Sequence, residues 1–412
     1  MEAGTTTAGR EKKKKTSALP HRKERVGAII IGGNFQGLGL LRSLARHDVP
    51  IYLLNKGLCI GRFSKYVTKN YNCPDVKEEA VFLEFLIDLA RQQGLQGWLI
   101  YPNDDETVYF LSRHKEQLEK YYRVTTPPWG IAKLAYNKML TYEIAKKYGI
   151  AIPTTYYTHN TQELERLDIK FPVIIKPSIR QPFLNKMRKK AIRVDNMERL
   201  VDSYKKAIKA IDDGQALMIQ ELIPGGPHNL YSVGSLCRNG ELLARVVVRR
   251  PRQRPMDFGR SSTFVQTVDI PELEGIATKI LQAIGYYGLS EVEFMFDPRD
   301  GKYKLLEINA RAWGWHTIAI GAGVDLPYLS YLDMLGANVR QNGFTKGVNW
   351  FRLLTDLPTA LEEILKGRMK VSSYFRSFSG KKQEAVLSMV DPMPFIMELV
   401  LLPYLWRKRG RM

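Results

Sequence analysis

Two carboxylates and an amide are spaced so that one β-hairpin would present all three on the same face. Residues 292–296 and 303–308 are rich in β-branched and aromatic side chains, and the turn-forming sequence Asp-Pro-Arg-Asp-Gly separates them. A turn within that sequence sets Glu293 opposite Glu307. Asn309, two residues further on, would project from the same face. The pattern therefore predicts a hairpin that gathers three oxygen-bearing side chains in one patch.

Such a patch would attract a hard divalent cation. Directly opposed side chains in a hairpin lie about 4.5–5.5 Å apart, where like charges repel, and carboxylate and amide oxygens are preferred ligands of Mg²⁺. We expect Mg²⁺ or Mn²⁺ at these three side chains, with Arg311 placed to reach an anion held by the metal. The alternative is an ordinary exposed hairpin whose acids pair with Lys302 or Lys304.

Length and composition predict a globular α/β protein with two or three domains. The chain has 412 residues, 44% of them hydrophobic and 25% charged, which is enough for sizeable cores. Strand-like and helix-like stretches alternate, which favours the α/β class. The three cysteines are far apart and lack metal-ligand spacing, so we expect no disulfide framework and a reducing cytoplasm. No apolar run is as long as the stretch of about 20 residues that spans a bilayer.

The net charge of +20 predicts anionic partners. Basic residues concentrate in an N-terminal arm that we expect to be disordered (1–25), in residues 176–209 and 245–260, and in the terminal residues 406–412. Nucleotides, nucleic acid and an anionic membrane all fit this charge, and composition alone does not choose among them.

Residues 26–125 carry the pattern of a small open parallel sheet. The expected order is strand 25–33, helix 36–47, strand 49–55, helix 78–94, strand 97–102 and helix 106–122. Gly32 and Gly37 flank the first strand-to-helix turn, but the spacing is not G-x-G-x-x-G and the second strand ends in Asn55 rather than an acid. A tight turn or a small-substrate loop is therefore favoured over NAD binding. For Asn-Asp-Asp at 103–105, substrate binding and helix capping both stay open.

The following residues predict a second unit and a larger sheet. We expect helices at 136–148 and 193–210 and strands at 171–177, 217–223, 230–237, 242–250 and 264–268. These strands lead into the hairpin.

Taken together, three features and the hairpin resemble the ATP-grasp superfamily. The features are Lys138 on the early helix, Lys176 at the end of Phe-Pro-Val-Ile-Ile-Lys-Pro, and Gln-Glu-Leu-Ile-Pro-Gly at 220–225. The resemblance covers about residues 26–335. Residues 249–259, 262–268 and 310–317 resemble more closely the branch called predicted ATP-dependent carboxylate–amine ligases.

The resemblance implies an ATP-grasp fold preceded by an open parallel-sheet domain, and it implies roles for the matching residues. Those implied to bind ATP are Lys138, Lys176, Gln220, Glu221 and Ile223. Those implied to bind Mg²⁺ are Glu293, Glu307 and Asn309. Arg311 would face the transferred phosphoryl group or the acyl phosphate.

Two basic segments depart from the family pattern or add to it. Many ATP-grasp enzymes cover the phosphates with a glycine-rich loop, whereas residues 177–191 contain no glycine. Lys190 or a basic neighbour could close over the phosphates instead, and a solvated basic loop is the alternative. Among the arginines of 249–254 we assign a catalytic role to Arg249, which would bind a substrate carboxylate or acyl phosphate; a charged surface strand is the alternative.

The expected organisation has four parts. They are the arm (1–25), the pre-ATP-grasp domain (26–125), the ATP-grasp domain (126–345, with lobes 126–220 and 221–345) and a C-terminal extension (346–412). The extension ends in an apolar stretch and a basic terminus, which could lie in the interface of the inner membrane face. A helix docked on the body is the alternative.

The leading hypothesis is an ATP-dependent ligase that activates a carboxylate as an acyl phosphate for attack by an amine. We expect small-molecule acid and amine substrates, no nucleic-acid partner, and a monomer or homodimer. One alternative is a non-catalytic basic protein that holds nucleic acid or a membrane surface. Another is an ATP-grasp phosphotransferase, whose product keeps the phosphoryl group.

Overall fold

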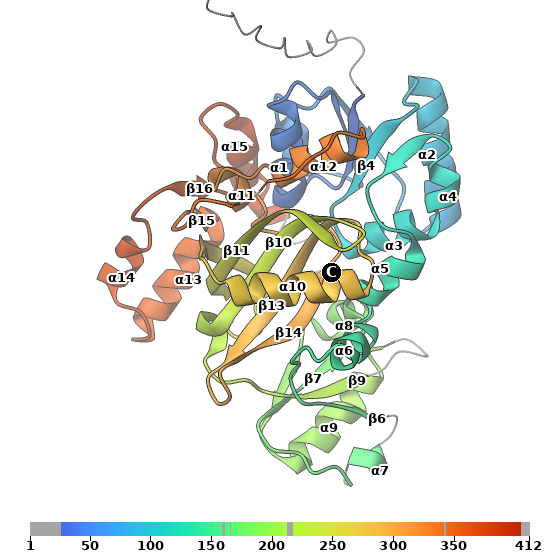
Figure 1. Ribbon diagram of the computed structural model, residues 1–412. Helices are drawn as coiled ribbons and strands as arrows, with labels where there is room; N and C mark the ends of the chain where they lie inside the picture. The colour runs from blue at the N-terminus through green and yellow to red at the C-terminus, as the bar shows by residue number, and fades with distance from the viewer. Residues whose placement is uncertain (1–25, 159–160, 165, 212–216, 342, 405–412) are drawn as a thin grey trace, which may run out of the picture.

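Three β-sheets form the framework of the protein (Figure 1). The computed structural model describes residues 26–158, 161–164, 166–211, 217–341 and 343–404. The predicted basic arm and the basic terminus lie outside the described residues.

The five-stranded sheet belongs to the N-terminal part of the chain and is parallel throughout, in the order β3-β2-β1-β4-β5. Its strands are β1 (Ala28–Ile31), β2 (Ile51–Asn55), β3 (Lys69–Asn72), β4 (Trp98–Pro102) and β5 (Tyr122–Val124). Its helices are α1 (Phe35–Ala45), η1 (Ile60–Phe63), α2 (Glu79–Gln93), α3 (Asp105–Arg113) and α4 (Lys115–Leu118). The predicted parallel sheet is confirmed. The helix expected at 106–122 is instead divided into α3 and α4, and the chain then enters β5 at Tyr122. The apolar residues of this stretch are buried on all three elements.

The four-stranded sheet is antiparallel, in the order β6-β9-β7-β8. Its strands are β6 (Thr155–Thr158), β7 (Val173–Pro177), β8 (Ile192–Val194) and β9 (Leu217–Glu221). The helices around it are α5 (Trp129–Tyr136), α6 (Lys138–Lys147), α7 (Thr161–Leu164), α8 (Arg180–Met187) and α9 (Met197–Ile208). The helix expected at 136–148 begins only at Lys138, since the Asn137 side chain caps α6 by accepting from the Met139 backbone.

The seven-stranded sheet has the order β14-β13-β10-β11-β12-β15-β16. Its strands are β10 (Leu230–Arg238), β11 (Glu241–Arg254), β12 (Ser261–Thr267), β13 (Gly288–Asp297), β14 (Lys302–Asn309), β15 (Asn349–Phe351) and β16 (Lys382–Glu384). Its helices are η2 (Gly226–Asn229), α10 (Pro271–Ala283), α11 (Ile318–Gly321) and α12 (Leu326–Met334). Helix α10 lies across one face, where its buried side chains share a hydrophobic core with Val292 and Phe294 (Figure 1). The opposite face carries Glu291 and Glu293.

The hairpin of β13 and β14 has the predicted pair at its centre. Glu293 lies opposite Glu307, but Phe294 lies opposite Leu305, so Leu306 is a β-bulge. Because of the extra residue, both Leu306 and Glu307 line the same cleft. A regular strand would have turned one of them to the other face.

The C-terminal segment completes the large sheet and returns to the N-terminal domain. Its helices are α13 (Leu353–Leu365), α14 (Val371–Arg376) and α15 (Met393–Val400). Since β15 and β16 belong to the seven-stranded sheet, that sheet continues beyond the boundary expected at residue 345. The Arg42 guanidinium of α1 binds the Asp391 carboxylate at 2.9 Å, just before α15. Among the described helices, none is long and apolar enough to cross a membrane.

Candidate active site

A cleft of about 650 Å³ lies between the four-stranded and seven-stranded sheets. Most residues that the sequence predicted for the site line it. They are Lys138, Lys176, Lys190, Gln220, Glu221, Ile223, Glu293 and Glu307. The cleft thus brings together cations from the N-terminal side of the chain and acids from the hairpin.

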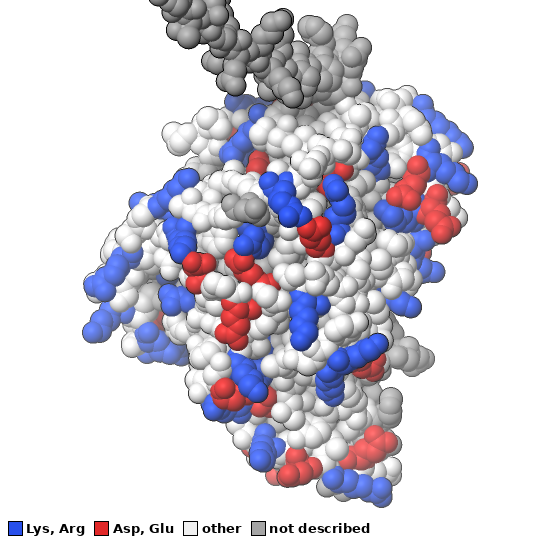
Figure 2. All heavy atoms as spheres, in the orientation of Figure 1, with Lys and Arg blue, Asp and Glu red and all other residues white. Residues whose placement is uncertain are grey.

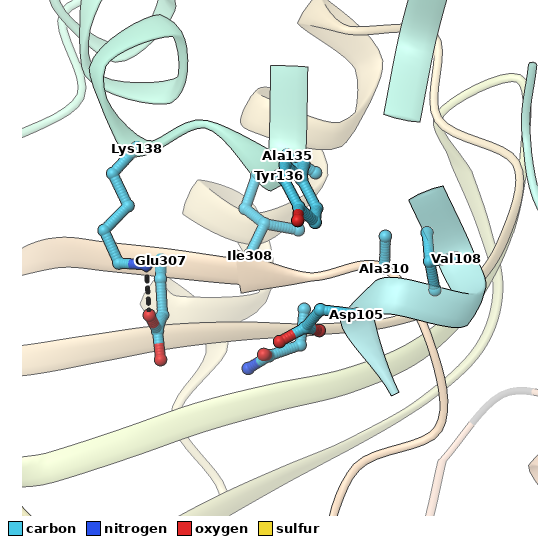
Figure 3. A pocket seen from close by; sticks show the side chains of 9 residues that line it. Asp105, Val108, Ala135, Tyr136, Lys138, Glu307, Ile308 and Ala310 are labelled. Atoms are coloured by element: carbon cyan, nitrogen blue, oxygen red, sulfur yellow. Dashed lines mark ion pairs between the residues drawn. The ribbon is translucent and has the colours of Figure 1, made fainter. Parts of the chain in front are cut away.

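The two hairpin acids pair with cations from other elements. Lys138, at the start of α6, approaches Glu307 at 2.9 Å between Nζ and Oε2 (Figure 3). Arg250 of β11 approaches Glu293 at 2.5 Å between Nη1 and Oε2. The alternative pairing does not occur, because the Lys304 ammonium instead lies 2.6 Å from Asp297. The acids are therefore held in the cleft by cations that contact the same space.

Asn309 joins this patch from the adjoining end of β14. Its Nδ2 donates to Glu293 Oε1 at 2.9 Å and to Glu291 Oε2 at 3.1 Å. Glu291 is a third, buried carboxylate that sequence reasoning missed, although its spacing two residues before Glu293 already placed it on the same face. Burial, and then the charge of Glu293, raises the pKa of Glu291. Trp315 donates its indole N–H to Glu291 at 2.9 Å.

Lys176 sits in a hydrogen-bonded cluster around Tyr142. The Lys176 ammonium donates to the Tyr142 hydroxyl at 2.9 Å, and Gln220 Nε2 donates to the same oxygen at 3.2 Å. The hydroxyl in turn donates to the Leu306 carbonyl at 2.9 Å. Burial, followed by the nearby charge of Lys138, lowers the pKa of Lys176 to about 7. Sequence reasoning missed Tyr142, since only the folded chain brings it to these partners.

Glu221 ties the end of β9 to the hairpin. It accepts from the backbone N–H of Thr154 at 2.8 Å and from the Lys304 ammonium at 2.9 Å. It also lies 2.5 Å from Arg299 Nη2. Ile223, close by, is buried on the cleft wall. These contacts set the apolar end of the cleft apart from the acidic end.

Arg311 lies next to the cleft rather than on its wall, and it binds an acid of the N-terminal domain. Arg311 Nε donates to Asp105 Oδ1 at 2.6 Å, and Nη2 donates to Asn309 Oδ1 at 3.4 Å. Asp104 caps α3 by accepting from the Thr107 backbone at 2.8 Å, so the capping interpretation holds for that residue. Asp105 lies close to Ala310, the residue that follows β14 (Figure 3).

The structure does not place Arg249 in the cleft. Successive residues of a strand face opposite sides, and here Arg249 is exposed while Arg250 is buried and lines the cleft. The arginine that lines the cleft is therefore Arg250, one residue beyond the one that we assigned. Arg252 is also turned away, since its guanidinium binds Asp356 at 2.7 Å.

The glycine-free segment after β7 is partly helical. Residues 180–187 form α8, and Arg188 ends the helix with a φ of +55°. Arg260 donates to the Arg188 carbonyl, which links the segment to the large sheet. Lys190 lines the cleft.

The donor chemistry of the hairpin fits a magnesium ion. Glu293 and Glu307 share one face at the cleft, and Asn309 adjoins them with its amide nitrogen toward Glu293 and its oxygen toward Arg311. Carboxylate oxygens of this kind suit Mg²⁺ when phosphate oxygens and water complete its shell. Across the residues that the structure describes, no group of three or more His, Cys, Asp or Glu side chains has the arrangement of a metal site. The fit therefore depends on the amide and on a bound anion.

The three sheets and the cleft between two of them define the ATP-grasp fold, and the resemblance to ATP-grasp ligases is confirmed by comparison with known proteins. A family described as "ATP-grasp in the biosynthetic pathway with Ter operon" matches residues 213–352. A D-aspartate ligase of Enterococcus faecium is 24% identical over 299 residues, which cover 69% of this chain and 70% of that protein.

Solved structures agree on the fold. An L-amino acid ligase from Bacillus licheniformis superposes with a TM-score of 0.58 at 15% identity, covering 76% of this chain and 75% of the other. A biotin carboxylase from Campylobacter jejuni in complex with β-γ-ATP gives a TM-score of 0.63 at 16% identity, covering 80% and 75%.

Proposed function

We propose that this protein is an ADP-forming, magnesium-dependent ligase that joins a small carboxylic acid to an amine. The observation that carries the proposal is the cleft in which Lys138 contacts Glu307 at 2.9 Å, with Lys176 lining the same cavity. Separate cationic and acidic groups on one cavity suit a triphosphate and its metal, because charge spreads over the non-bridging oxygens during phosphoryl transfer.

The nucleotide would lie with its base at the apolar end of the cleft. Ile174 and Ile223 come from the side of the small sheet, and Met295 and Leu306 from the large sheet. An adenine ring fits between such side chains, while the ends of β9 offer polar groups to its edge. The triphosphate would then extend toward Lys138 and Lys176, with Lys190 at the margin.

Glu293, Glu307 and Asn309 would hold the magnesium ion. When bound, the ion would neutralise charge on the phosphate oxygens during transfer. Lys138 and Arg250, which pair with the two acids, would then be available to the phosphate and to the substrate. Arg311 would position Asn309 through their hydrogen bond.

The reaction would proceed in two balanced steps. A carboxylate oxygen of the acid attacks the γ-phosphorus of ATP, the bond to the β-phosphate oxygen breaks, and ADP leaves. The nitrogen of a neutral amine then attacks the acyl carbon, inorganic phosphate leaves with the bonding electrons, and the nitrogen loses a proton. Arg250, which lines the cleft, would bind the carboxylate and the acyl phosphate, because its planar guanidinium suits both groups.

Amino acids are the first substrates to test. The relatives include a protein named D-aspartate ligase and one named L-amino acid ligase. A screen should therefore pair D- and L-amino acids with each other and with simple amines, and include a thiol and an alcohol acceptor. ADP release that requires both partners supports the proposal, and the amide product should appear in equal amount by mass spectrometry.

Replacing Glu307 with Gln provides the decisive variant. The substitution keeps the shape of the side chain but removes a charge from the metal patch, and losing such an interaction commonly costs about 100-fold or more in turnover. Glu84→Gln, on the exposed side of α2, is the matched control. If Glu307→Gln turned over at the rate of the control, the metal assignment would be wrong.

A further inference from the structure

Helix α15 turns an apolar face outward. Its exposed large side chains are Met393, Ile396, Leu399 and Val400, whereas Pro394 and Glu398 are buried. At 3.6 residues per turn, the exposed four fall on one side of the helix and the buried two on the other. A surface helix ordinarily directs its apolar side chains to the core and its charged ones to water. Here the charged residue is inside, where Glu398 pairs with Arg352.

The chain just before α15 adds two exposed apolar side chains. Met389 is 89% exposed and Val390 is 58% exposed. Among the described residues, fourteen of the nineteen exposed large hydrophobic side chains lie between Leu357 and Tyr404. The C-terminal apolar face consists of Met389, Val390, Met393, Ile396, Leu399 and Val400. Such a concentration marks an interaction surface, since isolated exposed hydrophobics are usually scattered.

Charges in the same segment are sorted by sign. The acids Asp356, Glu363, Asp391 and Glu398 are buried. The basic residues Lys366, Arg368, Lys370, Arg376, Lys381 and Lys382 are all exposed. Within residues 353–404, Glu362 is the one exposed acid. Lys65 is also exposed and lies beside the apolar face, because its backbone N–H donates to Asp391 at 3.0 Å. The sequence adds four further basic residues in 406–412.

We propose that the C-terminal apolar face docks in the headgroup region of an anionic phospholipid bilayer. Interfacial helices bury an apolar face while neighbouring Lys and Arg contact lipid phosphates. With eight residues, α15 is about 12 Å long, so it would lie along the surface rather than cross it. An anionic surface fits the exposed charges of this segment. Elsewhere on the molecule, Lys and Arg are interspersed with Asp and Glu on the face in Figure 2.

The proposal does not depend on the ligase assignment, and the full-length chain can test it directly. We expect the protein to float with vesicles of phosphatidylglycerol and phosphatidylcholine, and to bind vesicles of phosphatidylcholine alone more weakly. Binding to the anionic vesicles should weaken as salt rises, because headgroup charges are screened. A protein that stays in the aqueous fraction with anionic vesicles would overturn the proposal.

Substitutions distinguish binding through this face from non-specific binding to lipid. Met389→Asp with Val400→Asp should lower vesicle partitioning about tenfold or more, since each removes apolar area from the buried contact. Val81→Asp on α2 is the control, because Val81 is 50% exposed but lies outside the face. Equal loss in the control would contradict the proposal. So would a wild-type dimer that the double substitution dissociates without any vesicle binding, since the face would then join two copies.

Discussion

Lys176 is the residue whose charge state we expect to be most sensitive to the ligand. Burial, and then the charge of Lys138, lowers its pKa to about 7. A bound triphosphate would favour the charged form, so its pKa would rise toward the ordinary value of about 10.4. Nucleotide binding should then be coupled to proton uptake, and affinity should fall as pH rises above 7.

Calorimetry at pH 8 tests this coupling. We expect the binding enthalpy of ATP to depend on the ionisation enthalpy of the buffer, with an uptake close to one proton. Lys176→Met should remove most of that uptake and weaken binding, whereas the exposed Lys279→Met should change neither. An unchanged uptake in Lys176→Met would assign the proton to another group.

The same pKa has a consequence for stability. The unfolded chain holds this proton up to about pH 10.4, whereas the folded chain releases it near pH 7. Between these values the unfolded state binds more protons, so the free energy of unfolding should rise with pH from this group. The charged form of Lys176 therefore lowers the free energy of unfolding, and this cost is relieved as pH rises from about 7.

At the scale of elements, the hydrogen bonds of the Tyr142 hydroxyl connect one helix and three strands around the cleft. It connects α6 to Lys176 of β7, to Gln220 of β9 and to the Leu306 carbonyl at the bulge of β14. We expect Tyr142→Phe to lower the free energy of unfolding by about 1–3 kcal/mol, because buried partners lose their hydrogen bond. The KM for ATP should rise several-fold, since the lysine and the bulge lose a shared anchor.

Urea unfolding and ATP-dependent turnover measure these two effects. Tyr148→Phe is the matched control, as Tyr148 is 40% exposed at the end of the same helix. A Tyr142→Phe protein with wild-type KM would show that the cluster is not needed for nucleotide binding.

The hairpin could be predicted from sequence because its pattern is local. Glu293, Glu307 and Asn309 lie within 17 consecutive residues. The bulge at Leu306, which the sequence did not predict, is what sets Glu307 opposite Glu293. Tyr142 could not be found in this way, since its hydroxyl meets the Leu306 carbonyl across 164 residues. The cleft-lining arginine lies one position beyond the predicted one for a related reason: only the pairing of β11 with β10 and β12 decides which neighbour faces the cleft.

At the scale of the whole molecule, the C-terminal segment is fastened to the N-terminal domain by a buried ion pair. The Arg42 guanidinium donates to the Asp391 carboxylate at 2.9 Å, to the backbone carbonyl of Asp391 at 2.7 Å and to the Val386 carbonyl at 2.6 Å. Asp391 also accepts from the Ser64 hydroxyl at 2.7 Å. These hydrogen bonds join α1, the residues after η1 and the chain before α15. It could not be predicted from the sequence, because the two charges are 349 residues apart.

Removing one partner should be costly, because it leaves the other charge buried without compensation. We expect Arg42→Ala to lower the free energy of unfolding by about 3–5 kcal/mol, measured by urea denaturation, whereas the exposed Arg46→Ala on the next turn should cost little. The double variant Arg42→Ala/Asp391→Ala should lose less than the sum of the two single variants, since each single change already breaks the same contact. Additive losses would mean that the two ends of the chain are held together by packing, and that the ion pair contributes no coupling of its own.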